Sequence, residues 1–260
     1  MKGAGPVLVV KGLTVERDGA EVLRKVDATV RKGDFVGIIG PNGGGKTTFV
    51  LAVLGLIQSK RGKVELFGTP LRHFKDWGRI AYVSQNATDF DPHFPLTVRE
   101  LVSLGRVRRG NLGRPLKKED WNAVDEALSA MGITGIASRR IGDLSGGQKQ
   151  RVFVAKALVR HPDLIFLDEP VAGVDSSAQE LFYKKLSDLN ASTGITILLV
   201  SHDLTAVFCR MSKVMCVNKE VHMADVTPDL EPNDLLRKAY GEHFQFVFHR
   251  HTCRGDFGNG

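Results

Sequence analysis

The chain has 260 residues, of which 42% are hydrophobic, and a formal net charge of +7. This length and apolar content predict one sizeable core, alone or with an attached subdomain, and exclude a disordered protein. No apolar run approaches the roughly 18 to 20 residues that cross a bilayer, so we expect the chain to stay in the cytosol. The excess of cations would suit nucleic acid, an anionic membrane or polyphosphate, but the basic residues are spread out, which favours a solvated face.

The first elements along the chain read as strands. Residues 7–34 alternate apolar and polar side chains between turn signals, which predicts an antiparallel hairpin region. Short apolar runs then recur at 35–40, 80–85, 164–169 and 195–202. Such runs are typical of buried parallel strands, and open α/β sheets bind ligands at the carboxyl ends of these strands. We therefore expect functional side chains where the runs end.

Helices are expected between these strands. From 86 to 143 the strand signal disappears, and Thr97 and Glu100 have the spacing of a capping box at a helix start. A later helix has Ser176 and Gln179 at the spacing of a capping box, and Leu181, Leu186 and Leu189 give it an approximate apolar stripe. The expected division is a nucleotide-binding α/β core at 1–85 and 144–225, a helical subdomain at 86–143 and a C-terminal extension at 226–260.

A glycine-rich stretch after the first apolar run fits the pattern G-x-x-x-x-G-K-[ST]. Glycines let backbone N–H groups curl around phosphate oxygens, while Lys46 can reach the β and γ phosphates and the Thr47 hydroxyl can ligate Mg²⁺. The alternative is a glycine-rich turn without function. It explains less well why the stretch lies between a predicted strand and a predicted helix, as a phosphate loop does. The candidate phosphate-binding residues are Gly40, Pro41, Asn42, Gly43, Gly44, Gly45, Lys46, Thr47 and Thr48.

An acidic site, in addition to the glycine-rich stretch, is expected where the apolar run 164–169 ends. Asp168 is placed to hold Mg²⁺ beside the phosphates, and Glu169 to polarise the attacking water. Alone, such a pair is more often a solvated strand end. The glycine-rich stretch makes the functional interpretation the better one.

The stretch LSGGQ carries the strongest signal. Ser145 offers a hydroxyl, and Gly146, Gly147 and Gln148 open a predicted helix with exposed backbone amides, which is a second anion site. One small domain seldom closes two phosphate-binding helix starts around one nucleotide. We therefore expect this surface to cap the nucleotide of another copy of the chain.

The sequence resembles the ATP-binding subunit of ABC transporters over nearly its whole length. The resemblance rests on GPNGGGKTT, YVSQ with Gln85, LSGGQ, LIFLDEP, AGVD with Asp175 and SHD with His202, in the family's order. It implies a P-loop NTPase (RecA-like) α/β core with an N-terminal antiparallel β region and an inserted helical subdomain. It also implies ATP with Mg²⁺, and a dimer that sandwiches ATP between the phosphate loop of one copy and LSGGQ of the other.

Roles for further residues follow from the same resemblance. Glu169 and His202 would be catalytic, with His202 contacting the γ-phosphate. Gln85 would ligate Mg²⁺ with Thr47 and Asp168 and sense the transmembrane partner. Asp175 would contact the opposite subunit. One position departs from the family, since Asp18 stands about where an aromatic residue usually stacks on adenine, so apolar neighbours such as Val22 would have to hold the base.

The segment 90–106 and the C-terminal half resemble zinc and manganese uptake systems. This implies a multi-span permease, an extracytoplasmic metal-binding protein, a peripheral place on the cytoplasmic face of the membrane and no nucleic acid partner. Other substrates, such as a siderophore, stay open. A soluble ABC ATPase acting on nucleic acid or ribosomes fits less well, because this chain has one copy of each motif and only about a hundred residues between the phosphate loop and LSGGQ. A nucleotide kinase leaves LSGGQ unexplained. The tail residues His243, His249, His251 and Cys253 are possible metal ligands, with a solvated terminus as the favoured interpretation.

Overall fold

The structure is a computed structural model that describes residues 5–89, 94–108, 110–242 and 244. The tail positions that the sequence marks as possible metal ligands lie outside these residues. The chain divides into two compact units, which are described one at a time: unit 1 comprises Met1–Lys75 and Thr196–Gly260, and unit 2 comprises Asp76–Ile195. The core boundaries expected near 86, 143 and 225 remain a prediction.

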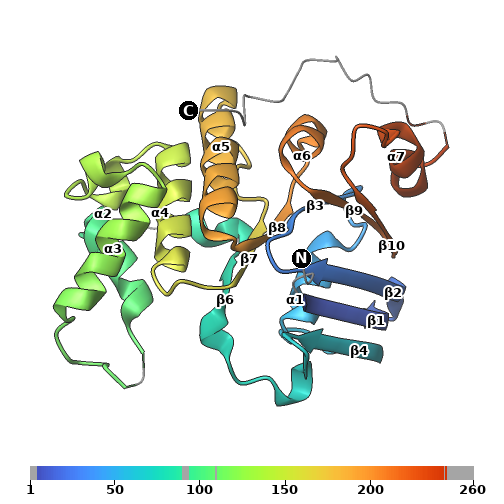
Figure 1. Ribbon diagram of the computed structural model, residues 1–260, viewed down its shortest axis with the longest axis horizontal. Coiled ribbons are helices and arrows are strands. Elements are labelled where there is room, and N and C mark those ends of the chain that lie inside the picture. Colours follow the sequence, from blue (N-terminus) through green and yellow to red (C-terminus); the bar gives the residue numbers. More distant parts are fainter. Residues whose placement is uncertain (1–4, 90–93, 109, 243, 245–260) are drawn as a thin grey trace. The chain divides into compact units, whose positions relative to one another are not determined.

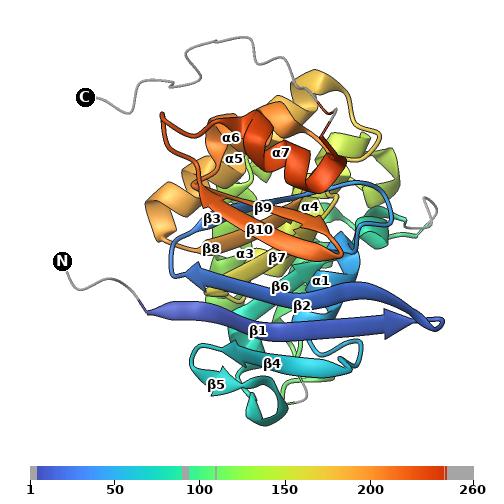
Figure 2. The ribbon, with the colours of Figure 1, turned by 90° about the vertical axis from the view of Figure 1, so that its right-hand side faces the viewer.

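Unit 1 begins with an antiparallel sheet (Figure 2). Its first two strands form the predicted hairpin, whose turn at Asp18 and Gly19 has positive φ values of 50° and 78°, as primed hairpin turns require. Along the second strand Val26, Ala28 and Val30 are buried while their neighbours are exposed, which is the period-two pattern of a half-buried sheet. The strand order is β2-β1-β4-β5, with bounds β1 Pro6–Arg17, β2 Ala20–Arg31, β4 Arg61–Leu66 and β5 Thr69–Pro70.

A second group of strands in unit 1 follows the order β10-β9-β3-β8. Every residue of β3 and β8 is buried, and β3 runs parallel to both β8 and β9, so the continuous apolar runs are buried parallel strands as predicted. Strand β10 lies antiparallel to β9, and α7 packs against both (Figure 2). The bounds are β3 Phe35–Ile39, β8 Thr196–Val200, β9 Lys213–Asn218, β10 Glu220–Asp225, α1 Lys46–Val53, α6 Leu204–Arg210 and α7 Pro232–Tyr240.

In the described part of unit 2, strands β6 and β7 run parallel and are accompanied by the α-helices α2, α3, α4 and α5 (Figure 1). Strand β6 pairs with β7 in a register that sets Tyr82 opposite Phe166. The predicted capping box is present, since the Thr97 side chain accepts from the backbone N–H of Glu100 and the Glu100 carboxylate accepts from that of Thr97. The bounds are β6 Ile80–Val83, β7 Leu164–Asp168, α2 Val98–Ser103, α3 Lys118–Ala130, α4 Gly146–Leu158 and α5 Ser176–Thr193.

For α5 the predicted capping box is wrong, and the predicted apolar stripe is buried at Leu186 and Leu189 but not at Leu181. The cap is Asp175, whose carboxylate accepts from the Ala178 N–H at 2.9 Å. Gln179 instead reaches back and donates to the Val174 carbonyl oxygen at 2.8 Å. Leu181 is 39% exposed, because the buried face of the helix passes through its neighbours Phe182 and Tyr183. None of the helices in the described part of the chain has the length and the apolar content that a membrane crossing requires.

Candidate functional site

The glycine-rich loop of unit 1 connects β3 to α1, and its backbone admits only glycine at key positions. Gly40 has φ +148°, and a Cβ added there would lie 2.0 Å from the carbonyl oxygen of Val217. A Cβ at Gly44 would lie 2.7 Å from the same oxygen. Gly45, at φ 102°, is the residue before α1 and offers no side-chain cap. Helix α1 therefore begins without a capping side chain, at the end of a helix where anions bind.

Lys46 is folded back onto the loop in this structure. Its side chain is 6% exposed, and its Nζ donates to the carbonyl oxygens of Gly40 at 2.9 Å and Pro41 at 3.1 Å. Both acceptors are neutral. A phosphate oxygen would form a stronger, charge-assisted bond to the same ammonium group, so the lysine is held close to the loop in which a phosphate would sit.

The N-terminal hairpin supplies an apolar neighbour to this loop. A Cβ on Gly45 would lie 3.0 Å from the carbonyl oxygen and 3.4 Å from Cγ1 of Val22. Asp18 lies in the hairpin turn and is exposed. Val22 is thus the better placed of the two for an apolar contact near the loop. His202, also in unit 1, follows β8 and is exposed, next to the buried Ser201.

Unit 2 brings three of the predicted residues into one cluster at the carboxyl ends of β6 and β7. Asp168 is 1% exposed, and Gln85 Nε2 donates to Glu169 Oε2 at 3.1 Å. Glu169 has φ +46°, a left-handed conformation that is uncommon outside glycine and is enriched at functional sites. Its backbone and its bond to Gln85 together fix where the carboxylate points.

Tyr82 is a member of this cluster that sequence reasoning missed. Its hydroxyl donates to Asp168 Oδ2 at 3.5 Å. Burial first, and then the charge of Asp168 and the hydrogen bond to it, raise the pKa of Tyr82 to about 12, so the hydroxyl stays protonated and donates at neutral pH. The contact arises because β6 pairs with β7, and the sequence does not reveal that pairing.

The LSGGQ stretch forms the start of α4, as predicted. The Ser145 side chain accepts from the Gln148 N–H, and the Gln148 side chain accepts from the Ser145 N–H at 3.1 Å. A Cβ on Gly147 would lie 2.9 Å from Cβ of Ala178 in the first turn of α5. The glycine therefore allows the starts of α4 and α5 to pack closely.

Asp175 caps α5 and remains anionic there. Hydrogen bonds from the Ser177 hydroxyl, first, and from the Ala178 N–H lower the pKa of this carboxylate. The structure thus places Ser145 and Asp175 at the starts of two neighbouring helices of unit 2, and the glycine-rich loop and His202 in unit 1.

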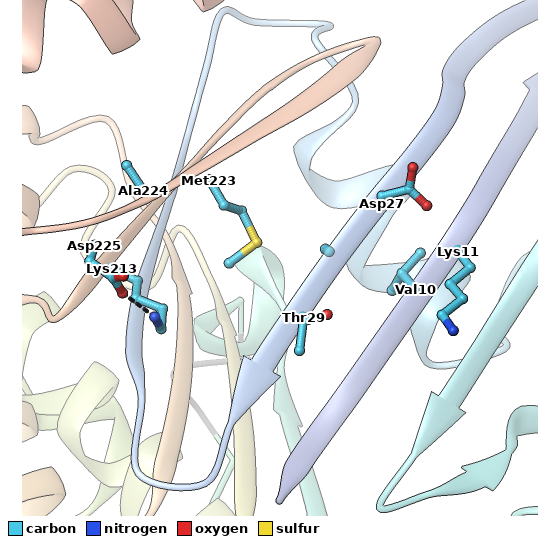
Figure 3. A pocket seen from close by; sticks show the side chains of 9 residues that line it. Val10, Lys11, Asp27, Thr29, Lys213, Met223, Ala224 and Asp225 are labelled. Carbon is cyan, nitrogen blue, oxygen red and sulfur yellow. Dashed lines mark hydrogen bonds and ion pairs between the residues drawn. The ribbon is translucent and has the colours of Figure 1, made fainter. Parts of the chain in front are cut away.

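An open pocket of about 540 Å³ lies in unit 1 between β1 and β2 on one side and β9 and β10 on the other (Figure 3). Lys213 and Asp225 form an ion pair at one side, and Met223 extends from β10 towards β2. None of its lining residues belongs to the glycine-rich loop, so it is not the predicted phosphate site. In the part of the chain that the structure describes, no group of three or more His, Cys, Asp or Glu side chains is placed to hold a metal ion.

The chain is similar to proteins of one family. The family model described as "ABC transporter" matches residues 23–172. The zinc uptake system ATP-binding protein ZurA of Listeria innocua is 41% identical over 215 residues, 83% of this chain and 84% of the relative. The manganese transport system ATP-binding protein MntB of Listeria monocytogenes is 37% identical over 90% of this chain and 95% of its own.

Two solved structures share the fold. CbiO1 from Clostridium perfringens, part of an ABC transporter complex, superposes with a TM-score of 0.76 and 26% identity and covers 90% of this chain and 94% of its own. A dimeric ATP-binding cassette bound to ADP and Pi gives 0.69 and 26%, over 85% of this chain and 99% of its own.

Proposed function

The chain belongs to the ABC transporter family as an ATP-binding subunit, and from this membership we propose that it drives uptake of a divalent transition metal, zinc first and manganese second. The chain is an ABC-type ATPase. The observation that carries the metal assignment is the 41% identity to a zinc uptake ATP-binding protein over 83% of the chain. The manganese relative supports it over a still longer stretch.

The proposed nucleotide chemistry starts at the glycine-rich loop. Residues 40–48 hold the phosphates of ATP through backbone N–H groups, and Lys46 moves its ammonium group from the carbonyl oxygens of Gly40 and Pro41 to the β and γ phosphates. The adenine ring rests against apolar groups such as Val22.

The oxygen donors of Thr47, Gln85 and Asp168 suit Mg²⁺, which favours a few protein oxygens and completes its coordination with water and phosphate. Gln85 uses its Nε2 on Glu169, so its Oε1 serves as the donor. When bound, Mg²⁺ would neutralise charge that develops on the phosphates. Tyr82, donating to Asp168 Oδ2, orients that carboxylate.

Hydrolysis requires a base for the attacking water, and we assign this role to Glu169. Its carboxylate accepts a proton as the water oxygen bonds to the γ-phosphorus and the bond to the bridging oxygen of ADP breaks, which yields ADP and phosphate. The Gln85 side chain holds the carboxylate during this step. His202 contacts the γ-phosphate and helps to hold it in line.

The proposed functional unit is a dimer of two ATP-binding subunits. Ser145 to Gln148 of one copy close over the nucleotide bound by the phosphate loop of the other, and Asp175 contacts the opposite copy. The dimeric cassette with ADP and Pi, which is 26% identical to this chain, supports a dimer as the functional unit. The remaining partners are a multi-span permease and an extracytoplasmic metal-binding protein, with this subunit on the cytoplasmic face of the membrane.

The test is coupling between metal and ATP hydrolysis in the whole complex, reconstituted in lipid with its metal-binding protein. A transported substrate must bias the conformational equilibrium that closes the ATP sites, so zinc-loaded binding protein should raise ATP hydrolysis. Glu169→Gln should remove the rise, whereas Glu126→Gln, an exposed carboxylate in α3, should keep it. Stimulation by a siderophore or an amino acid, with none by zinc or manganese, would overturn the metal assignment and leave the ATPase intact.

A further inference from the structure

The C-terminal extension of unit 1 reaches the start of the glycine-rich loop. Helix α7 buries Leu235, Leu236 and Ala239, and its last residue, Tyr240, stacks on Phe244 with ring centroids 4.6 Å apart. The Tyr240 hydroxyl accepts a hydrogen bond from the backbone N–H of Gly40 at 3.0 Å. A side chain that lies 200 residues further along the chain therefore satisfies the first amide of the loop.

The turn between β9 and β10 connects the same two elements a second time. The Lys219 N–H donates to the Gly44 carbonyl oxygen at 3.0 Å, and Asn218 Nδ2 donates to the Ala239 carbonyl oxygen at 2.8 Å. The loop and the end of α7 are thus bonded directly, through Tyr240, and indirectly, through this turn.

Gly40 carries both hydrogen bonds that matter here. Its N–H is held by Tyr240 and its carbonyl oxygen by Lys46 Nζ. Gly40 is buried, and a buried amide needs a partner. If Lys46 leaves the Gly40 carbonyl oxygen to bind phosphate, the Tyr240 side chain still holds Gly40 in place through its N–H.

We propose that Tyr240 is a positioning residue for nucleotide binding: its hydroxyl fixes Gly40, and through Gly40 the phosphate loop, when Lys46 transfers to the phosphates of ATP. Through Gly40, helix α7 is thereby part of the nucleotide site. Burial raises the pKa of Tyr240 against a smaller opposite effect of the Gly40 hydrogen bond, so the hydroxyl stays neutral over the usual assay range. The inference rests on the proposed role of the phosphate loop.

The experiment compares Tyr240→Phe with the full-length wild type by calorimetric titration with ATP and with inorganic triphosphate. The variant keeps the ring that stacks on Phe244 and removes only the oxygen. We expect both dissociation constants to rise by the same factor, roughly five-fold, which corresponds to about 1 kcal/mol for one hydrogen bond. We expect kcat at saturating ATP to change less than KM.

The matched control is Tyr183→Phe, which removes a hydroxyl from a buried tyrosine in α5 and should leave both dissociation constants unchanged. If the Tyr240 hydroxyl served stability alone, Tyr240→Phe would lower the unfolding temperature and leave both dissociation constants of the folded protein unchanged. That result, or weaker ATP binding with unchanged triphosphate binding, would overturn the inference.

A third variant separates this inference from the proposed function. Lys46→Ala should abolish binding of triphosphate. If it does while Tyr240→Phe binds like wild type, only the role of Tyr240 fails, and if Lys46→Ala still binds triphosphate, the loop assignment itself fails. Amide exchange supplies a test in the wild type: the Gly40 N–H should stay protected after ATP is added, and fast exchange in the ATP complex would contradict the proposal.

Discussion

Glu169→Gln is the substitution that best separates chemistry from binding in this protein. Glutamine has the shape of glutamate and keeps an oxygen that can accept the bond from Gln85 Nε2, now 3.1 Å from Glu169 Oε2. The left-handed backbone at this position, φ +46°, is no harder for glutamine than for glutamate. The change therefore removes the charge and the proton-accepting oxygen while the local geometry stays.

The expected loss follows from the role of a general base, which contributes about 10²- to 10⁴-fold to a rate. At about 1.4 kcal/mol per factor of ten, this is roughly 3 to 5 kcal/mol of activation free energy. The affinity for ATP should change little, because the carboxylate acts on water and the phosphate loop holds the nucleotide.

Phosphate release at saturating ATP and Mg²⁺ measures the loss, and size exclusion with ATP should show that the variant accumulates as a dimer. Glu126→Gln, which removes an exposed carboxylate of the same unit, is the control and should hydrolyse ATP like wild type. Hydrolysis by Glu169→Gln within a few-fold of wild type would refute the assignment and place the base elsewhere.

Two further predictions concern the dimer and the helical part of unit 2. Lys46→Ala and Ser145→Asp should each be inactive alone, the second because aspartate still caps α4 but repels phosphate. Mixing the two variants should restore activity, because each heterodimer then has one intact site. A mixture no more active than its components would contradict the sharing of sites between copies. Asp120 accepts from Arg106 Nε at 2.7 Å, and this bond first, then the Lys117 N–H, holds the pKa of Asp120 below its ordinary 3.8. The ionised carboxylate therefore stabilises the folded state above pH 3.8, and this stabilisation is lost as pH falls through the lower folded-state pKa. Asp120→Asn should lower the urea midpoint at pH 7, and the difference in midpoint from wild type should shrink in acid. An equal difference in midpoint at pH 7 and at pH 2.5 would show that the charge of Asp120 plays no part.

The sequence alone determined the elements whose physical requirements are local. Buried strands β3, β7 and β8 need uninterrupted apolar runs, and the structure has strands at each of them. The loop before α1 needs glycine where its backbone is left-handed, as at Gly43 and Gly45, whose φ values are 74° and 102°. The capping box at Thr97 depends on residues only three apart. In each case the constraint acts within one segment, so the amino-acid pattern is enough to show it.

Tertiary structure decided what depends on residues far apart or on a choice between equal neighbours. Asp175 and Ser176 are both good caps, and only the backbone geometry selects Asp175. Tyr82 meets Asp168 because the register of two strands, 86 residues apart at this contact, brings them together. Tyr240 meets Gly40 across 200 residues because α7 packs on β9 and β10. No local pattern encodes such contacts, because the packing of the whole of unit 1 or unit 2 fixes the distance between the two side chains.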